Sequence, residues 1–102
     1  MTDVVFLRDG TVFALFPAFT GSVDDPDVAI CYQSVGQHGQ AHIDYCMTCI
    51  EVTDPAEYAD LKGELERIGY DDLNVVELGS IDSTDYYNLR LANCPVYRER
   101  EA

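Results

Sequence analysis

The stretch Asp54–Tyr70, DPAEYADLKGELERIGY, predicts the one long helix from which the fold is inferred. Asp54 is a typical N-cap, because its carboxylate can accept from the free amides of the first turn. Pro55 falls at the first helical position, where its missing N–H costs nothing. Glu57 has the spacing of a capping-box partner. At the other end, Gly69 suits the left-handed residue of a Schellman motif.

One face of this predicted helix is apolar. Its apolar residues recur at helical spacing and are Tyr58, Leu61, Leu65 and Ile68. Gly63 costs roughly 1 kcal/mol relative to alanine, so either the helix tolerates it or a neighbouring segment approaches closely. Tyr70 is expected to fold back on the last turn. A helix with one apolar face is not stable alone, so the rest of the chain must supply an apolar layer.

Length and composition indicate one domain. With 102 residues, 47% of them hydrophobic, the chain can bury a modest core. No apolar run approaches the roughly 20 residues of a membrane span, and no basic-then-apolar segment marks a secretory signal. We therefore expect a single cytoplasmic domain over residues 1–102, with residues 93–102 as a frayed tail.

The charge is strongly negative. Nineteen acidic residues against six Lys and Arg give a formal net charge of −13. Such a surface repels phosphates, which excludes direct binding of nucleic acid and of anionic membranes. Two interpretations stay open: the charge is a solubility device, or it forms an acidic face for a basic partner.

Residues 3–16, DVVFLRDGTVFALF, predict a β-hairpin. Asp9-Gly10 suits a two-residue type I′ turn, and in that register Phe6 lies opposite Phe13. Both faces of the hairpin are apolar, so we expect it in the centre of a sheet. One face should meet the helix, and the other needs a cover from a C-terminal segment or from a second subunit.

Further strands are predicted over residues 28–34, 42–51, 73–78 and 86–92, from β-branched and aromatic content and from alternation. A helix over residues 41–50 is the competing interpretation, because its apolar residues also have helical spacing. The expected fold class is α+β, in the order ββββαββ. A mostly antiparallel sheet would carry one long helix on one face.

Polar and metal-ligating residue types gather in residues 36–49. The turn before the predicted fourth strand offers free amides and polar side chains, so Gln37, His38 and His42 are candidate ligand-binding residues. With Cys46 and Cys49, the histidines make H-x3-H-x3-C-x2-C, whose residue types suit tetrahedral zinc. A strand would point the two cysteines to opposite faces, and a helix would spread the four residues over about 16 Å. We therefore expect no metal and no cofactor.

The cysteines do not predict an enzyme. Four are present, Cys31, Cys46, Cys49 and Cys94, and the sequence leaves open whether they are free, bridged or metal-bound, although a cytoplasmic location favours free thiols. A Cys–His nucleophilic pair would need a glycine-framed turn and an oxyanion donor, and the sequence shows neither. Redox C-x-x-C motifs normally open a helix, which CMTC is not expected to do. We expect a non-enzymatic protein.

Three segments together carry a resemblance: ALFP at 14–17, GQH at 36–38 and PAEYADLKxELExIGY at 55–70. The chain resembles, over residues 3–78, a group of small uncharacterised proteins carried by bacterial mobile elements. The part after Gly79 looks like an extension. The resemblance implies a compact α+β domain from a conjugative element or phage, and it brings no assigned activity.

Acidic residues recur along and just after the predicted helix, and the candidate partner-binding residues are Glu57, Asp60, Glu64, Asp71 and Asp72. A negative band resembles a phosphate backbone and can dock in the basic groove of a nucleic-acid-binding protein. Small acidic phage and plasmid proteins act in this way on restriction and CRISPR nucleases. An anti-restriction or anti-CRISPR role is therefore suggested for this chain by analogy.

The leading hypothesis is therefore a non-enzymatic interaction protein of a mobile element that binds a basic partner. The alternatives are a small metal- or ligand-binding domain that uses residues 36–49, and a structural homodimer formed through an uncovered hairpin face.

Overall fold

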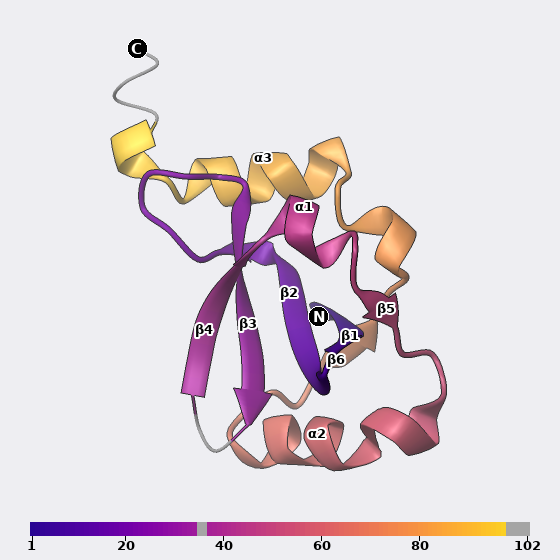
Figure 1. Ribbon diagram of the computed structural model, residues 1–102. Helices are drawn as coiled ribbons and strands as arrows, with labels where there is room; N and C mark the ends of the chain where they lie inside the picture. The colour runs from indigo at the N-terminus through magenta and orange to yellow at the C-terminus, as the bar shows by residue number, and fades with distance from the viewer. Residues whose placement is uncertain (35–36, 98–102) are drawn as a thin grey trace.

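Two long strands form the hairpin at the centre of the sheet, β1 (Thr2–Asp9) and β2 (Thr11–Thr20) (Figure 1). The structure is a computed structural model, and it describes residues 1–34 and 37–97. Half of the residues of the two strands are buried, and they lie on both faces of the sheet because apolar residues occupy both faces. The prediction that the hairpin is central is confirmed.

The remaining strands extend this hairpin on both sides. β3 (Val28–Ser34) and β4 (Gln37–His42) continue beyond β2, so that the order is β4-β3-β2-β1 with antiparallel neighbours. The other edge of β1 is shared by two short strands: β5 (Ile50–Glu51) is antiparallel to one end, and β6 (Leu73–Val75) is parallel to the other. The expected α+β class with a mostly antiparallel sheet is confirmed.

The register of the hairpin differs from the prediction. One residue, Gly10 with φ of +79°, separates the last paired residues of the two strands. The predicted type I′ turn with Phe6 opposite Phe13 is therefore wrong, because Phe6 pairs with Ala14. Side chains alternate along a strand, so a shift of one residue exchanges the faces. Phe13 and Leu15 consequently lie on the opposite face of the sheet from Phe6.

The sheet has an apolar core on each side. The α2-side core, under helix α2 (Pro55–Arg67), consists of Val4, Phe6, Ala14, Phe16, Tyr32, Val52, Leu61 and Leu65. The α1-side core, under helix α1 (Ile43–Cys46), consists of Val5, Leu7, Phe13, Leu15, Ala29, Cys31, Ile43, Cys46 and Ile81. Both faces of the hairpin are thus covered by this chain, the second partly by the C-terminal segment. The homodimer hypothesis stays a prediction.

Helix α2 has the ends that its sequence predicts. The Asp54 carboxylate accepts from the Ala56 amide at 3.0 Å. At the other end Tyr70 N donates to Leu65 O at 3.0 Å, and Gly69 has a φ of +126°. These are the bond and the backbone conformation of a Schellman motif. The expected helix and both of its ends are confirmed.

Two details around α2 correct the prediction, and a third adds to it. The Glu57 carboxylate contacts Arg8 and does not close a capping box. Ile68 is 46% exposed, because it is the C-cap residue and lies beyond the last turn over the sheet. Tyr70 stacks on Phe16, with 4.9 Å between the ring centroids, and thereby joins the helix end to β2.

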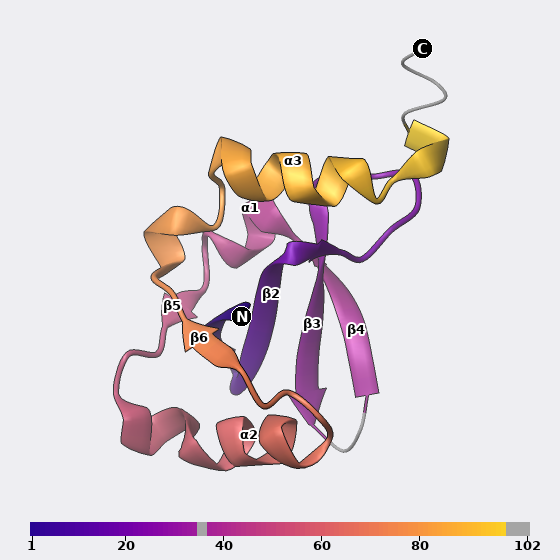
Figure 2. The same cartoon turned by 180° about the vertical axis from the view of Figure 1, so that it is seen from behind.

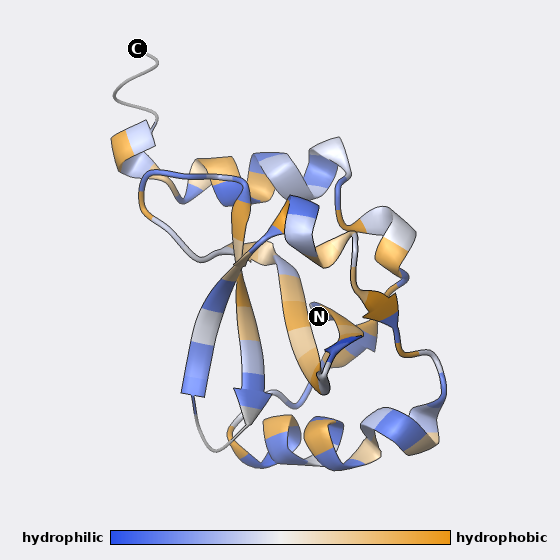
Figure 3. Ribbon diagram, in the orientation of Figure 1, coloured by the Kyte–Doolittle hydropathy of each residue, from blue (hydrophilic) through white to orange (hydrophobic). Residues whose placement is uncertain are grey.

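The predicted fourth strand over residues 42–51 is wrong. β4 comes earlier, over the residues expected as a turn, and α1 and β5 occupy the predicted range. Figure 3 shows β4 mainly in hydrophilic colours, while β2 is hydrophobic. Backbone pairing with β3 makes β4 a strand without an apolar pattern. The competing helix interpretation holds only for Ile43–Cys46, which His42 caps by accepting from Asp44 N at 3.3 Å.

The C-terminal part is helical. A 3-10 turn, η1 (Leu78–Ser80), follows β6, and α3 (Thr84–Ala92) crosses the end of the sheet opposite to α2 (Figures 1 and 2). The strand predicted over 86–92 is wrong, because the Ser83 hydroxyl accepts from Tyr86 N at 3.3 Å and caps a helix. The order ββββαββ with one helix is therefore replaced by α1, α2, α3 and a 3-10 turn, and residues 95–97 are helical as well.

Two residues of the C-terminal segment hold the loop between β2 and β3. The Arg90 guanidinium donates to the carbonyls of Pro17 and Pro26, each at 2.6 Å. Cys94 is fully buried, and its thiol donates to Ser22 O at 3.2 Å. Residue 94 is thus packed, contrary to the expected frayed tail over 93–102, of which 98–102 lie outside the described residues.

None of the described helices is long and apolar enough to cross a membrane.

Replacing Gly63 by alanine is expected to stabilise the protein by about 1 kcal/mol. A Cβ added there would meet only the Arg67 guanidinium at 3.5 Å, an ordinary contact with a flexible side chain. The sequence is compatible with two explanations for Gly63, that the helix tolerates it or that a neighbouring segment approaches closely. The open space around the added Cβ favours the first. Urea unfolding monitored by circular dichroism measures the change. An unchanged or lowered free energy of unfolding would contradict the expectation.

Candidate functional site

The acidic side chains of the described residues all reach the surface. Nineteen Asp and Glu are present, of which Glu99 and Glu101 lie outside the described residues, and none of the others is buried. No hydrophobic or ion-paired interior site therefore accounts for the negative charge of this part of the chain. The charge is presented to solvent or to a partner.

The predicted partner-binding residues follow α2 and its end, and we call them the acidic band: Glu57, Asp60, Glu64, Asp71 and Asp72. The first three lie at i, i+3 and i+7, on one side of the helix. Glu57 and Asp60 are exposed, and Glu64 is half-buried. Helical spacing thus brings these three carboxylates together, as the sequence predicts.

The ends of the acidic band contact the two ends of β1. Glu57 accepts from Arg8 Nη2 at 3.2 Å, and Asp72 accepts from the Thr2 hydroxyl at 2.9 Å. Hydrogen bonds from the Met1 amino group and from Thr2 lower the pKa of Asp72. Thr2 and Arg8 are six residues apart in a strand, or about 20 Å. The two ends of the acidic band therefore contact β1 at points about 20 Å apart, while α2 between them crosses the end of the sheet (Figure 1).

Little positive charge offsets the acidic band. Arg90 is 1% exposed and takes no part in the surface. Lys62 forms a helical pair with Glu66 at 3.1 Å, Arg8 is paired with Glu57, and Arg67 is an exposed cation at the end of α2, three residues after Glu64. Arg98 and Arg100 lie outside the described residues. Exposed ion pairs of this kind contribute about 0–1 kcal/mol to stability. They reduce the negative potential locally, but they do not form a fixed positive patch.

The predicted ligand-binding residues lie on β4, and two of them have local contacts. His38 Nε2 is 2.8 Å from the Tyr70 hydroxyl, and its ring meets the Tyr32 ring edge-on at 5.0 Å. His42 caps α1. Gln37 is exposed, and Gly36 of the same predicted turn lies outside the described residues. A hollow of about 350 Å³ adjoins His38. The ligand hypothesis for Gln37, His38 and His42 stays a prediction.

The zinc constellation is not assembled. His38 and His42 are four residues apart in an extended strand, or about 13 Å. Cys46 lies in the α1-side core. Among residues 1–34 and 37–97, no three His, Cys, Asp or Glu side chains are grouped as metal ligands. The residue types are those that bind zinc, but the extended strand holds the two histidines too far apart to bind one ion.

The four cysteines, all within the described residues, are free thiols. Burial raises the pKa of Cys31 and raises that of Cys46 to about 12. Cys31 also faces the α1-side core, while His38 contacts Tyr32 of the α2-side core, so the two do not form a nucleophilic pair. A protonated, buried thiol is a poor nucleophile at neutral pH.

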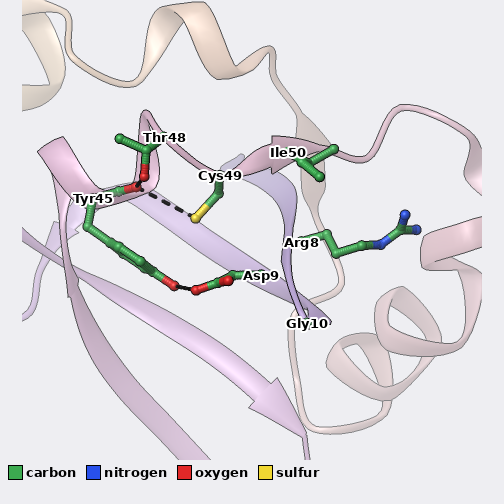
Figure 4. A pocket seen from close by; sticks show the side chains of 7 residues that line it. All are labelled: Arg8, Asp9, Gly10, Tyr45, Thr48, Cys49 and Ile50. Atoms are coloured by element: carbon green, nitrogen blue, oxygen red, sulfur yellow. Dashed lines mark hydrogen bonds between the residues drawn. The ribbon is translucent and has the colours of Figure 1, made fainter.

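A second hollow, of about 350 Å³, lies between the β1–β2 turn and the segment after α1 (Figure 4). Its lining residues are Arg8, Asp9, Gly10, Tyr45, Thr48, Cys49 and Ile50. The Tyr45 hydroxyl donates to the Asp9 carboxylate, and this hydrogen bond raises the pKa of Tyr45. No pattern in the sequence indicates this hollow, because it depends on how α1 is placed against the hairpin.

Comparisons with protein-family models, with curated proteins and with solved structures find no match to this chain. The function is therefore inferred from its own residues.

Proposed function

We propose that this chain is a non-enzymatic interaction protein that binds a basic partner protein through the acidic band. The observation that supports this proposal is the imbalance of charge at the surface. The described carboxylates are all solvent-accessible, while the cations are few, and Arg90 is buried. A one-signed surface attracts an oppositely charged partner and speeds its association.

The dimensions of the acidic band favour a partner that binds nucleic acid. Its extent of about 20 Å corresponds to about six base pairs of duplex, at 3.4 Å per phosphate of one strand. Carboxylates on a helix have fixed spacing, so they can occupy several phosphate sites of a basic groove together. In a mobile element of a bacterium, such a partner would be a host restriction or CRISPR nuclease, which the protein would inhibit in the cytoplasm.

Reversing two charges of the acidic band tests the proposal. Asp60→Lys with Asp71→Lys changes two exposed carboxylates that make none of the contacts described above. We expect the affinity for a basic protein captured from a bacterial lysate to fall at least about tenfold, or about 1.4 kcal/mol. Titration calorimetry at several salt concentrations measures this loss, which should shrink as salt rises.

The matched control carries the same charge change elsewhere. Glu77→Lys with Asp82→Lys alters two exposed carboxylates on the segment around η1, away from α2 (Figure 2). We expect a loss of affinity below about twofold, since charges more than a Debye length away are screened. Equal losses for both double variants would show that only net charge matters, and they would reject the acidic band as the binding surface.

A further inference from the structure

The two cysteines of the CMTC segment lie at the ends of one tight backbone turn. Cys46 is the last residue of α1, and Cys49 N donates to Cys46 O at 3.1 Å. Thr48 N donates likewise to Tyr45 O at 3.0 Å. A turn closed in this way brings its first and last Cα atoms within about 7 Å. Disulfides join residues whose Cα atoms are about 4.4–6.8 Å apart, so the backbone is compatible with a bridge.

Both thiols also belong to one side of the sheet. Cys46 is a fully buried member of the α1-side core, and Cys49 packs against the same cluster. Burial is the main cause of the raised pKa of Cys46, and the charges of Cys49 and Cys31 raise it further. The backbone turn and the shared core therefore place the two thiols together.

Only one of the two thiols is accessible. Cys49 is half-buried and lines the hollow between Tyr45 and Ile50 (Figure 4). Its Sγ is 3.6 Å from Tyr45 O, and the sulfur points into the hollow. Cys46 has no exposed surface. A reagent in the hollow therefore meets Cys49 first, and Cys46 only through Cys49.

We propose that Cys49 and Cys46 are a thiol–disulfide switch that is oxidised by the disulfide of a low-molecular-weight thiol. The Cys49 thiolate attacks one sulfur of the small disulfide, forms a mixed disulfide and releases one thiolate. The Cys46 thiolate then attacks the Cys49 sulfur and releases the second thiolate. Two protein thiols lose two electrons, the small disulfide gains them, and the two leaving thiolates take up the two protons.

The order of the steps follows from the surroundings of each sulfur. Cys49 has access and starts the exchange, and Cys46 resolves the mixed disulfide because it is next to Cys49 and shielded from solvent. The ionisable groups that act on Cys46 are Cys49 beside it and Cys31 on β3. Helix N-termini lower thiol pKa values, but this pair lies at the end of α1. The second step is therefore slow at neutral pH and speeds up as pH rises.

Dithiodipyridine, which releases a coloured thiopyridone at each step, tests this proposal on the folded chain. We expect two thiopyridones per chain and a final mass lower by two hydrogen atoms, with Cys46 and Cys49 joined in the peptide map. Release of the second should quicken about tenfold per pH unit below the Cys46 pKa of about 12. A stable pyridyl adduct on Cys49, no release at all, or a bridge to Cys31 would overturn the proposal.

Serine variants of the two cysteines test which thiol starts the exchange and which one resolves the mixed disulfide. Cys46→Ser should release one thiopyridone and keep the adduct, while Cys49→Ser should release none as long as it stays folded by circular dichroism. Cys94→Ser is the matched control, because Cys94 is buried beside Ser22 and outside the α1-side core. It should release two, like the unaltered chain. If Cys46→Ser does not fold, the peptide map of the unaltered chain alone decides between a bridge and an adduct.

Discussion

Replacing Arg90 by alanine is expected to lower the free energy of unfolding by about 3–5 kcal/mol. Arg90 Nε donates to Pro26 O and Nη1 to Pro17 O, both at 2.6 Å, and the side chain is 1% exposed. Burial lowers the pKa of Arg90, and the charge of Asp27 opposes this shift. Truncation would leave two buried carbonyls without donors and a cavity between α3 and the loop, and each effect destabilises.

Two further variants separate charge from geometry. Arg90→Lys keeps the charge, but an ammonium lacks the planar fork that serves two carbonyls, so we expect a loss between that of alanine and zero. Arg67→Ala removes an exposed arginine from the end of α2 and should change stability by about 0.5 kcal/mol or less. Urea unfolding measures all three. A cost below about 1 kcal/mol for Arg90→Ala would show that water replaces the guanidinium.

The second large effect is expected at Gly21, where alanine should cost at least about 2 kcal/mol. A Cβ there would lie 2.7 Å from Ala29 O and 2.9 Å from the Gln40 Cβ. The first of these is a backbone atom of β3, and Gly21 N itself donates to Val28 O at 2.9 Å. Relief of the clash would therefore pull the loop away from the sheet and weaken that bond.

Gly79→Ala is the matched control for this substitution. Position 79 is also outside the strands, and a Cβ there meets nothing within 4 Å. We expect a change in the free energy of unfolding within about 0.5 kcal/mol. If Gly21→Ala were equally neutral in urea unfolding, the close approach of residue 21 to β3 would be wrong.

The sequence predicted best where local chemistry decides the structure. Asp54, Pro55 and Gly69 specify the ends of α2 through their own bonds and dihedrals, and the range 28–34 was predicted as a strand with its observed bounds. Three of the candidate partner-binding carboxylates could be placed on one side of α2, because the helix itself was predictable. Such elements need no knowledge of distant contacts.

Elsewhere the deciding contacts are distant in sequence. The hairpin is apolar on both faces, so hydrophobicity could not select between two registers. β4 is a strand because β3 pairs with it, and its sequence has no alternation to read. In α3 the buried residue is Arg90, a type that is normally exposed, so the apolar alternation at 87–91 was misleading. Ser83 was a usable N-cap signal that the alternation outweighed.

The Figure 4 hollow and the CMTC turn show the same limit. Asp9 and Tyr45 are 36 residues apart, and no local pattern connects them. The two cysteines were predicted on opposite faces of a strand, and a short helix places them at the ends of a turn instead.

The covering of the α1-side core has a consequence for synthesis on the ribosome. One side of the hairpin can be closed once α2 has left the exit tunnel, but the other needs Ile81, and the loop after β2 needs the bond from Arg90 to Pro26. Until those residues emerge, Leu7 and Leu15 remain exposed to solvent in the nascent chain and can associate with other apolar surfaces. Chaperone capture should therefore be strongest for translation intermediates that already display α2 and still lack α3.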